Sequence, residues 1–172
     1  MRIIMFFDQI QAGLGGKERN DLSLGASSIV IGAGSMIEPH LDKEDKIIAC
    51  FYSGDKFFSD NEEKVINKVV ESMDKLNPDI VILGPSYNYA GYSRMCAILA
   101  DNINRRTKTK AITAMSKENM DIIDAYKDKI HIVKMPKKGG TGLTEALENI
   151  IEAARITYTG MDKENRIKEI CY

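Results

Sequence analysis

The chain has 172 residues, enough for one domain that buries a core without disulfides or a structural metal. Its 24 basic and 25 acidic residues give a net charge of −1, so we expect neither a nucleic-acid nor a membrane partner. Three cysteines without C-x-x-C spacing and two histidines argue against a disulfide framework and a metal site. The first apolar run is too short for a signal peptide, which predicts a cytoplasmic protein.

Short apolar runs alternate with amphipathic ones along the chain, which is typical of βα units around a mostly parallel sheet. The runs predict five strands, at residues 2–7, 46–52, 79–83, 110–114 and 130–135. All five are short and apolar, which indicates a sheet covered on both faces. The predicted fold class is therefore α/β: a single-domain, three-layer αβα sandwich with a mostly parallel five-stranded sheet, flavodoxin-like.

Apolar side chains at helical spacing predict the helices between these strands. The expected helices cover residues 61–76, 88–104, 116–126 and 141–156. Residues 22–41 are interrupted by glycines, which predicts an irregular loop followed by a short helix near residues 35–41. We expect the α/β domain to span residues 1–157, and the polar residues 158–172 to form a loosely held tail.

A glycine-rich segment, residues 8–18, directly follows the first apolar strand. Gly13, Gly15 and Gly16 allow positive φ and close approach of a ligand to the backbone, while Gln11 and Glu18 offer polar contacts. The alternative is a surface turn, since glycine clusters are first of all turn formers. The spacing matches neither G-x-G-x-x-G nor G-x-x-x-x-G-K-[ST], so no nucleotide follows from it, and we expect no bound cofactor.

Unusual polar residues also follow the second, third and fourth strands. Because ligands gather beyond the carboxyl ends of parallel strands, we expect these loops and the glycine segment to meet and form a small polar cleft. The candidate ligand-binding residues at this edge are Gln11, Gly13, Gly15, Gly16, Glu18, Ser53, Asp55, Gly84, Pro85, Asn88, Tyr92, Met115, Glu118 and Asn119.

Several of these candidates have structural alternatives. Gly84-Pro85 sets a turn in one interpretation, and Asp55 is a turn residue or a helix cap. In the alternative interpretation, Asn88 is a helix N-cap, which is the more common role of an isolated Asn at a helix start. Tyr92 would then pack in the interior with its hydroxyl hydrogen-bonded. Residues 137–142 either bind an anion at a helix N-terminus or form a solvated basic turn.

Cys96 is the candidate catalytic residue, two turns into a predicted helix. The alternative of a buried, inert thiol is favoured there, because a reactive cysteine needs exposure and a lowered pKa.

These motifs, in their order, resemble the N-terminal part of the component B selenoprotein subunits of the glycine, sarcosine, betaine and D-proline reductases. The resemblance covers about residues 2–155. It rests on Gln11, Gly13, Gly15, Gly16, Glu18, Gly54, Asp55, Phe58, Asn77, Pro78, Asp79, Gly84, Pro85, Asn88, Tyr92, Cys96, Thr113, Met115, Glu118 and Asn119.

Proteins of that family remove the amino group of their substrate reductively, with a selenocysteine of component B as the nucleophile. The resemblance implies an amino-acid-like ligand and a reductase partner subunit. The family's selenocysteine segment is not visible in this chain. Ser53 stands where the family tends to have cysteine, Gly91 where it has arginine, and Ala114 where it has glycine.

Three functions stay open at this point. The first is a reductase-family subunit that binds a small amino-acid-like ligand and works with a chain supplying the redox group. The second is a non-catalytic binding or regulatory module. In the third, Cys96 or Cys171 replaces the selenium nucleophile. Apolar helix faces also leave room for a homo-oligomer.

Overall fold

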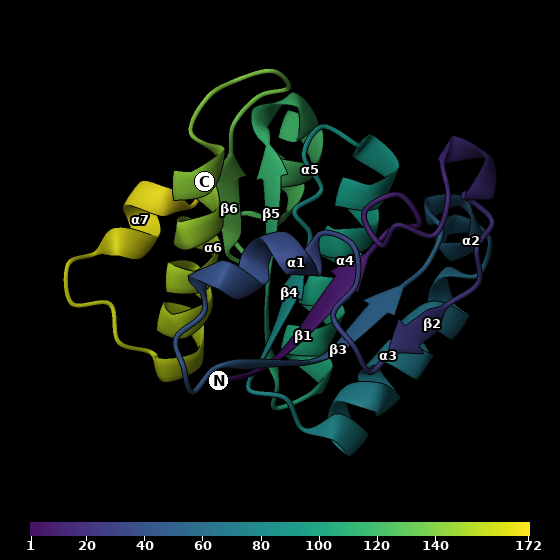
Figure 1. Ribbon diagram of the computed structural model, residues 1–172, viewed down its shortest axis with the longest axis horizontal. Coiled ribbons are helices and arrows are strands. Elements are labelled where there is room, and N and C mark those ends of the chain that lie inside the picture. Colours follow the sequence, from purple (N-terminus) through teal and green to yellow (C-terminus); the bar gives the residue numbers. More distant parts are fainter.

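A computed structural model describes all residues from 1 to 172 and contains one six-stranded sheet, in the order β2-β3-β1-β4-β5-β6 (Figure 1). Its strands are β1 (Arg2–Phe7), β2 (Gly25–Ser27), β3 (Lys46–Tyr52), β4 (Ile80–Leu83), β5 (Lys110–Ser116) and β6 (Ile132–Met135). Neighbouring strands are parallel except for β2, which pairs antiparallel with β3. The predicted α/β class with a mostly parallel sheet is confirmed.

Helices cover both faces of the sheet. The α-helices are α1 (Gly34–Ile37), α2 (Asp55–Asp60), α3 (Glu62–Leu76), α4 (Ala90–Arg106), α5 (Met120–Tyr126), α6 (Leu143–Thr159) and α7 (Arg166–Ile170). Short 3₁₀ turns form η1 (Lys17–Arg19), η2 (Glu38–His40) and η3 (Lys117–Asn119). In Figure 1, α6 and α1 lie on one face, and α3, α4 and α5 lie on the other.

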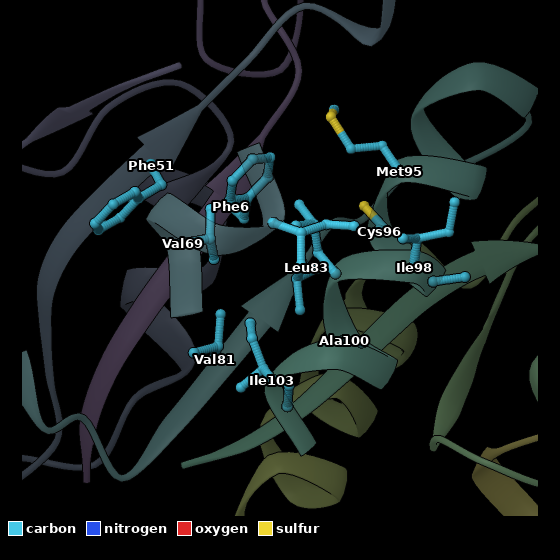
Figure 2. Close-up of a cluster of buried hydrophobic side chains, with 14 of the residues drawn as sticks. Phe6, Phe51, Val69, Val81, Leu83, Met95, Cys96, Ile98, Ala100 and Ile103 are labelled. Atoms are coloured by element: carbon cyan, nitrogen blue, oxygen red, sulfur yellow. The ribbon is translucent and has the colours of Figure 1, made fainter. Parts of the chain in front are cut away.

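Two hydrophobic cores result, one on each face. Alternate residues of β1 point to opposite sides, so that Phe6 packs in the core beneath α3 and α4, and Phe7 in the core beneath α1 and α6. Figure 2 shows the first core, where Val69 of α3 lies near Phe6, and Ile103 of α4 lies near Val81 of β4. Burial on both faces explains why the strands are uniformly apolar.

The secondary-structure elements that the sequence did not predict are short. The sheet has six strands instead of the expected five, because β2 has three residues and lies at the sheet edge, where no alternating pattern develops. Residues 22–41 otherwise form loops with the short helix α1 and the turn η2, close to the expectation. Helix α2 was also missed, since its six residues are too few to show helical spacing.

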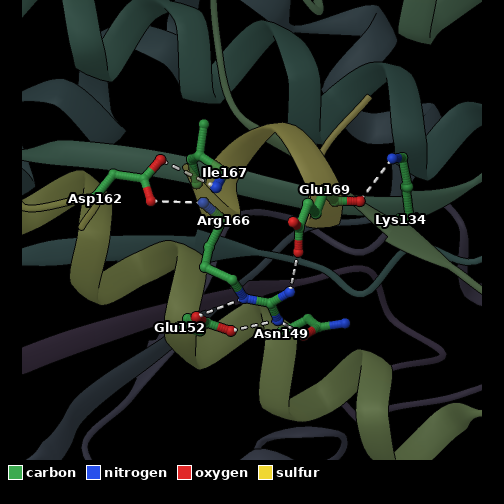
Figure 3. Close-up of polar contacts among 7 residues, drawn as sticks. All are labelled: Lys134, Asn149, Glu152, Asp162, Arg166, Ile167 and Glu169. Atoms are coloured by element: carbon green, nitrogen blue, oxygen red, sulfur yellow. Dashed lines mark hydrogen bonds and ion pairs between the residues drawn. The ribbon is translucent and has the colours of Figure 1, made fainter. Parts of the chain in front are cut away.

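The end of the chain differs from the expected loosely held tail. Helix α7 packs on α6, Cys171 is buried, and the Tyr172 N–H donates to the Ile132 carbonyl of β6 at 3.1 Å. Figure 3 shows the reason: the Arg166 guanidinium donates to both oxygens of Glu152, each at 3.0 Å, and also pairs with Glu169. The polar residues of this segment thus fasten it to the domain.

Arg166→Ala is expected to release α7 from α6. Because the guanidinium is partly exposed, we expect only a modest loss in the free energy of unfolding. The clearer readout is amide hydrogen exchange, which is expected to rise at Cys171 and Tyr172. Lys168→Ala, at an exposed neighbouring position, is the control, and equal exchange in both variants would contradict this account.

Candidate functional site

A cavity of about 210 Å³, here the first cavity, opens at the carboxyl edge of the sheet. The loops after β1, β3 and β4 meet there, where the strand order reverses around β1, the usual place for a ligand in an open α/β sheet. Its lining residues are Asp8, Gln9, Ile10, Lys17, Asn20, Asp55, Tyr89, Ala90 and Gly91. The glycine-bearing turn and the tyrosine-rich turn therefore meet at a common edge, as expected.

A second cavity of about 310 Å³ lies beside the first and shares Tyr89 with it. Gln11, Tyr87 and Asn88 line this second cavity together with the loop between β6 and α6. The basic turn at residues 137–140 is thereby brought to the same edge as the other loops.

The three glycines of the first loop lie outside both cavities. Gly13 and Gly15 have φ values of 72° and 143°, and the Gly16 N–H donates to the Glu18 carboxylate at 2.8 Å. Their surroundings match the turn alternative. Of the loop's predicted ligand contacts, only Gln11 lines a cavity.

The loop after β3 contributes one cavity residue. Asp55 lines the first cavity and starts α2, where its carboxylate accepts a hydrogen bond from the Lys56 N–H at 3.0 Å. Ser53 is fully buried, and its hydroxyl donates to the Gly54 carbonyl at 3.3 Å.

The residues after β4 divide between core and cavity. Gly84 and Pro85 are buried and joined by a cis peptide bond. Tyr92 is also buried, and its hydroxyl donates to the Phe6 carbonyl at 2.8 Å, as the packing alternative describes. The N-cap role of Asn88 is wrong, because α4 starts after Tyr89 and has no side-chain cap.

The loop after β5 supports the edge without lining either cavity. Met115 lies within β5 itself and is buried in the core. The Asn119 amide donates to the Tyr87 carbonyl at 2.6 Å, and the Glu118 carboxylate accepts from the Lys138 N–H at 3.1 Å. These two contacts tie the tyrosine-rich turn and the basic turn to the end of β5.

The sequence reasoning missed Asp8 and Gln9, which form the inner wall of the first cavity. Each is only 3% exposed. Burial raises the pKa of the Asp8 carboxyl to about 6. The hydrogen bond from the Gln11 N–H acts in the opposite direction and lowers this pKa, whereas the charge of Asp55 raises it further. The Gln9 amide donates weakly to Gly16, whereas its carbonyl oxygen is buried without a partner. The signal available in the sequence was an acid placed directly after an apolar strand.

Cys96 lies in the core that Figure 2 shows. It is next to Tyr92 and has no exposed surface. Burial raises the pKa of its thiol well above the usual value. Burial likewise raises the pKa of Cys171 to about 12. Both placements argue against a thiolate nucleophile and match the buried, inert thiol.

Iodoacetamide at neutral pH is therefore expected to leave Cys50, Cys96 and Cys171 unmodified in the folded protein, since all three are buried. Labelling in urea, followed by mass spectrometry, is the control that shows that all three thiols can react with iodoacetamide once they are exposed. Rapid modification of any of them without denaturant would contradict this expectation.

No group of three or more His, Cys, Asp or Glu side chains is arranged to hold a metal ion. None of the helices has the length and apolar character needed to cross a membrane.

The fold and the first cavity define a class: an α/β protein with a small polar site at the carboxyl edge of its sheet. The family model described as "Glycine/sarcosine/betaine reductase selenoprotein B (GRDB)" matches residues 1–169. The chain belongs to this family, as its motifs indicated.

The chain is similar to subunits of reductase complexes. It is 24% identical over 77% of its length to the glycine reductase complex component B subunit gamma of Carboxydothermus hydrogenoformans. It is 28% identical over 69% to the subunit of the same name from Symbiobacterium thermophilum, and 22% identical over 78% to the sarcosine reductase complex component B subunit beta of Peptoclostridium acidaminophilum.

These alignments cover 30%, 28% and 30% of the respective relatives, so the chain spans less than a third of their length. No solved structure matches the chain, and the flavodoxin-like likeness stays a prediction.

Proposed function

We propose that this chain is a reductase component B-like protein that binds a small amino-acid-like ligand at the carboxyl edge of its sheet. In this proposal it works with a partner subunit in reductive deamination. The observation that carries the proposal is the polar first cavity, found at the strand-order reversal of a chain that belongs to the reductase family.

The chemistry of the first cavity supports a small polar ligand. Two carboxylates, one lysine and two side-chain amides line it, so that it offers both charges within a small volume. The three buried thiols support the part of the proposal in which the redox group comes from another chain. They also support the cytoplasmic location included in the proposal, because free thiols are typical of a reducing compartment.

The alternative is a ligand-binding or regulatory paralogue without redox chemistry. The same absence of an accessible thiol favours it. The two functions differ in whether a partner is present and whether the bound amine is cleaved.

Isothermal titration with glycine, sarcosine, betaine and D-proline tests ligand binding, which both functions require. Purification from native cells under anaerobic conditions separates them, followed by an assay with a thiol reductant for release of ammonia from glycine or of methylamine from sarcosine. A co-purifying reductase subunit and substrate-dependent release would support the proposal. A protein that binds a ligand but has no partner and no turnover would support the alternative, and absence of heat with all four ligands would contradict both.

A further inference from the structure

The two ends of the sheet are covered differently. The strand order places β6 at one end and β2 at the other, and Figure 1 shows β2 on the far side of the sheet from α7. Cys171 forms a β-bridge with Val133 of β6. The Tyr172 N–H donates to the Ile132 carbonyl of the same strand at 3.1 Å, so the chain itself covers this end of the sheet. No segment of the chain pairs with the outer edge of β2.

An open sheet edge exposes backbone donors and acceptors that can pair with another chain. Proteins usually protect such an edge with charged side chains, proline, a β-bulge or a very short strand. β2 consists of Gly25, Ala26 and Ser27 and pairs with β3 in an unbroken register, so its shortness is the only one of these protections present. Three residues alone hold a partner weakly, so a stable contact at this edge also needs side chains around the strand.

The surface that flanks β2 carries no charge. Residues 22–37 contain no Asp, Glu, Lys, Arg or His, although 28% of the whole chain is charged. Residues 9–16 are also uncharged and lie against this segment, because the Ala33 N–H donates to the Gln11 carbonyl at 2.7 Å. Most residues of the two segments are exposed or half-buried. Depletion of charge is typical of the core of a protein–protein interface.

Large apolar side chains are exposed in the same two segments. Ile29 is 70% exposed, more than any other large hydrophobic residue of the chain, and Leu14 and Met36 are 38% and 39% exposed. The Ser27 hydroxyl donates to the Ile29 carbonyl at 2.9 Å and accepts from the Ile29 N–H at 3.2 Å, which fixes the backbone of Ile29 relative to β2. Apolar exposure beside an open sheet edge indicates an interaction surface.

We propose that residues 9–16 and 22–37 form the interface of a homodimer, in which β2 pairs antiparallel with β2 of a second copy of this chain. A two-fold axis near Ala26 relates the two copies and joins their sheets into one. Ile29 of each copy packs against the uncharged surface of the other. This inference is independent of the ligand in the proposed function.

A second copy fits this surface better than an unrelated protein. Two identical strands that pair antiparallel are related by a two-fold axis, so the open edge of β2 is complementary to itself. A two-fold interface also brings each patch against its own copy. A charged patch would repel itself there, whereas these two segments have no charge to repel. Their combined length is also close to the roughly 20–30 residues that a standard interface takes from each partner.

Sedimentation equilibrium of the full chain, at concentrations up to about 0.1 mM, tests for the dimer. The expected mass is twice the 19.2 kDa of one chain. Amides within residues 24–28 are expected to exchange with solvent more slowly in the concentrated sample than in a dilute one, because the second copy pairs with them. A monomer at the highest concentration, or a dimer in which these amides exchange as in the dilute sample, would overturn the proposal.

Ala26→Lys and Ala26→Glu test the two-fold axis, since Ala26 is exposed at the middle of β2. Each variant places like charges opposite each other across the axis, so we expect each to raise the dissociation constant of the dimer by about tenfold or more. An equimolar mixture of the two variants is expected to restore the dimer, because each interface then has one charge of each sign.

Ala125→Lys and Ala125→Glu, at an exposed site on α5, are the matched controls and are expected to dimerise like the natural chain. Circular dichroism that matches the natural chain shows that each variant is folded. A dimer that the Ala26 and Ala125 variants leave equally stable, or a loss of dimer that the mixture does not reverse, would contradict pairing through β2. Neither result bears on ligand binding, so the proposed function would stand.

Discussion

Asp8→Asn is expected to stabilise the folded chain at pH 8 by up to about 3 kcal/mol. The folded state raises the pKa of this carboxyl from 3.8 to about 6, and each unit corresponds to roughly 1.4 kcal/mol of cost in the charged form. Asparagine removes the charge and keeps the oxygen that accepts the Gln11 N–H at 2.6 Å. A substitution that stabilises the fold and weakens ligand binding is the result expected of a residue retained for function.

The pH dependence of this gain has a defined sign. Because the folded pKa lies above the unfolded one, folding takes up a proton between about pH 4 and 6, so the cost of Asp8 is full above pH 6 and disappears below about pH 4. The groups that face Asp8 are Asp55, Tyr92 and Cys96, and Lys17 lines the same cavity.

Urea unfolding of both proteins at pH 4, 6 and 8 measures the effect. The stability difference is expected to shrink toward zero at pH 4, and Asp74→Asn, at an exposed site, is expected to show no such trend. A variant less stable than the natural chain at pH 8, or a difference independent of pH, would contradict the assignment of Asp8.

Gly54→Ala is expected to cost about 1–3 kcal/mol of stability and to abolish ligand binding. Its Cβ would lie 2.1 Å from the Asn20 carbonyl oxygen and 2.8 Å from the Leu22 nitrogen, both of them backbone atoms. That segment cannot yield freely, because the Gly54 N–H donates to Leu22 at 2.8 Å and the Phe57 N–H donates to Asn20 at 3.0 Å. Asn20 and Asp55 face the first cavity from the two sides of this contact.

Thermal unfolding and the glycine titration measure the two effects. Gly16→Ala is the matched control, since a Cβ there would meet only the carboxylate of the Glu18 side chain, which can move aside. Equal behaviour of the two variants would show that the contact between residues 20 and 54 does not shape the cavity.

The sequence was sufficient for the central strands, because burial on both faces makes them uniformly apolar. The predicted bounds of β1 and β3 agree with the structure, and those of β5 differ by two residues. The carboxyl edge followed from the parallel order, which brings the loops after β1, β3 and β4 together. The motifs, taken in order, were also sufficient to identify the family.

Individual site residues were harder to predict, because the same pattern serves two roles. The glycine triplet suggested backbone contact with a ligand, yet none of the three glycines lines either cavity, whereas the neighbouring Asp8 lines the first. The sequence pattern of a single acidic residue after a strand is the same whether its side chain is exposed or buried. The polar composition of the C-terminal segment suggested a loose tail. The hydrogen-bonded ion pair between Arg166 and Glu152 joins residues 14 positions apart, so no local sequence pattern reveals it.

The Tyr92 hydroxyl and the Gly84 N–H both donate to the carbonyl of Phe6, two residues before Asp8. β1, the end of β4 and α4 thus meet at a single carbonyl oxygen, two residues before the wall of the first cavity. The base of the pocket is anchored to the hydrophobic interior, while its entrance is built from short surface loops. If the proposed ligand binds there, we expect its selectivity to depend on the entrance residues, which can change without disturbing this anchored base.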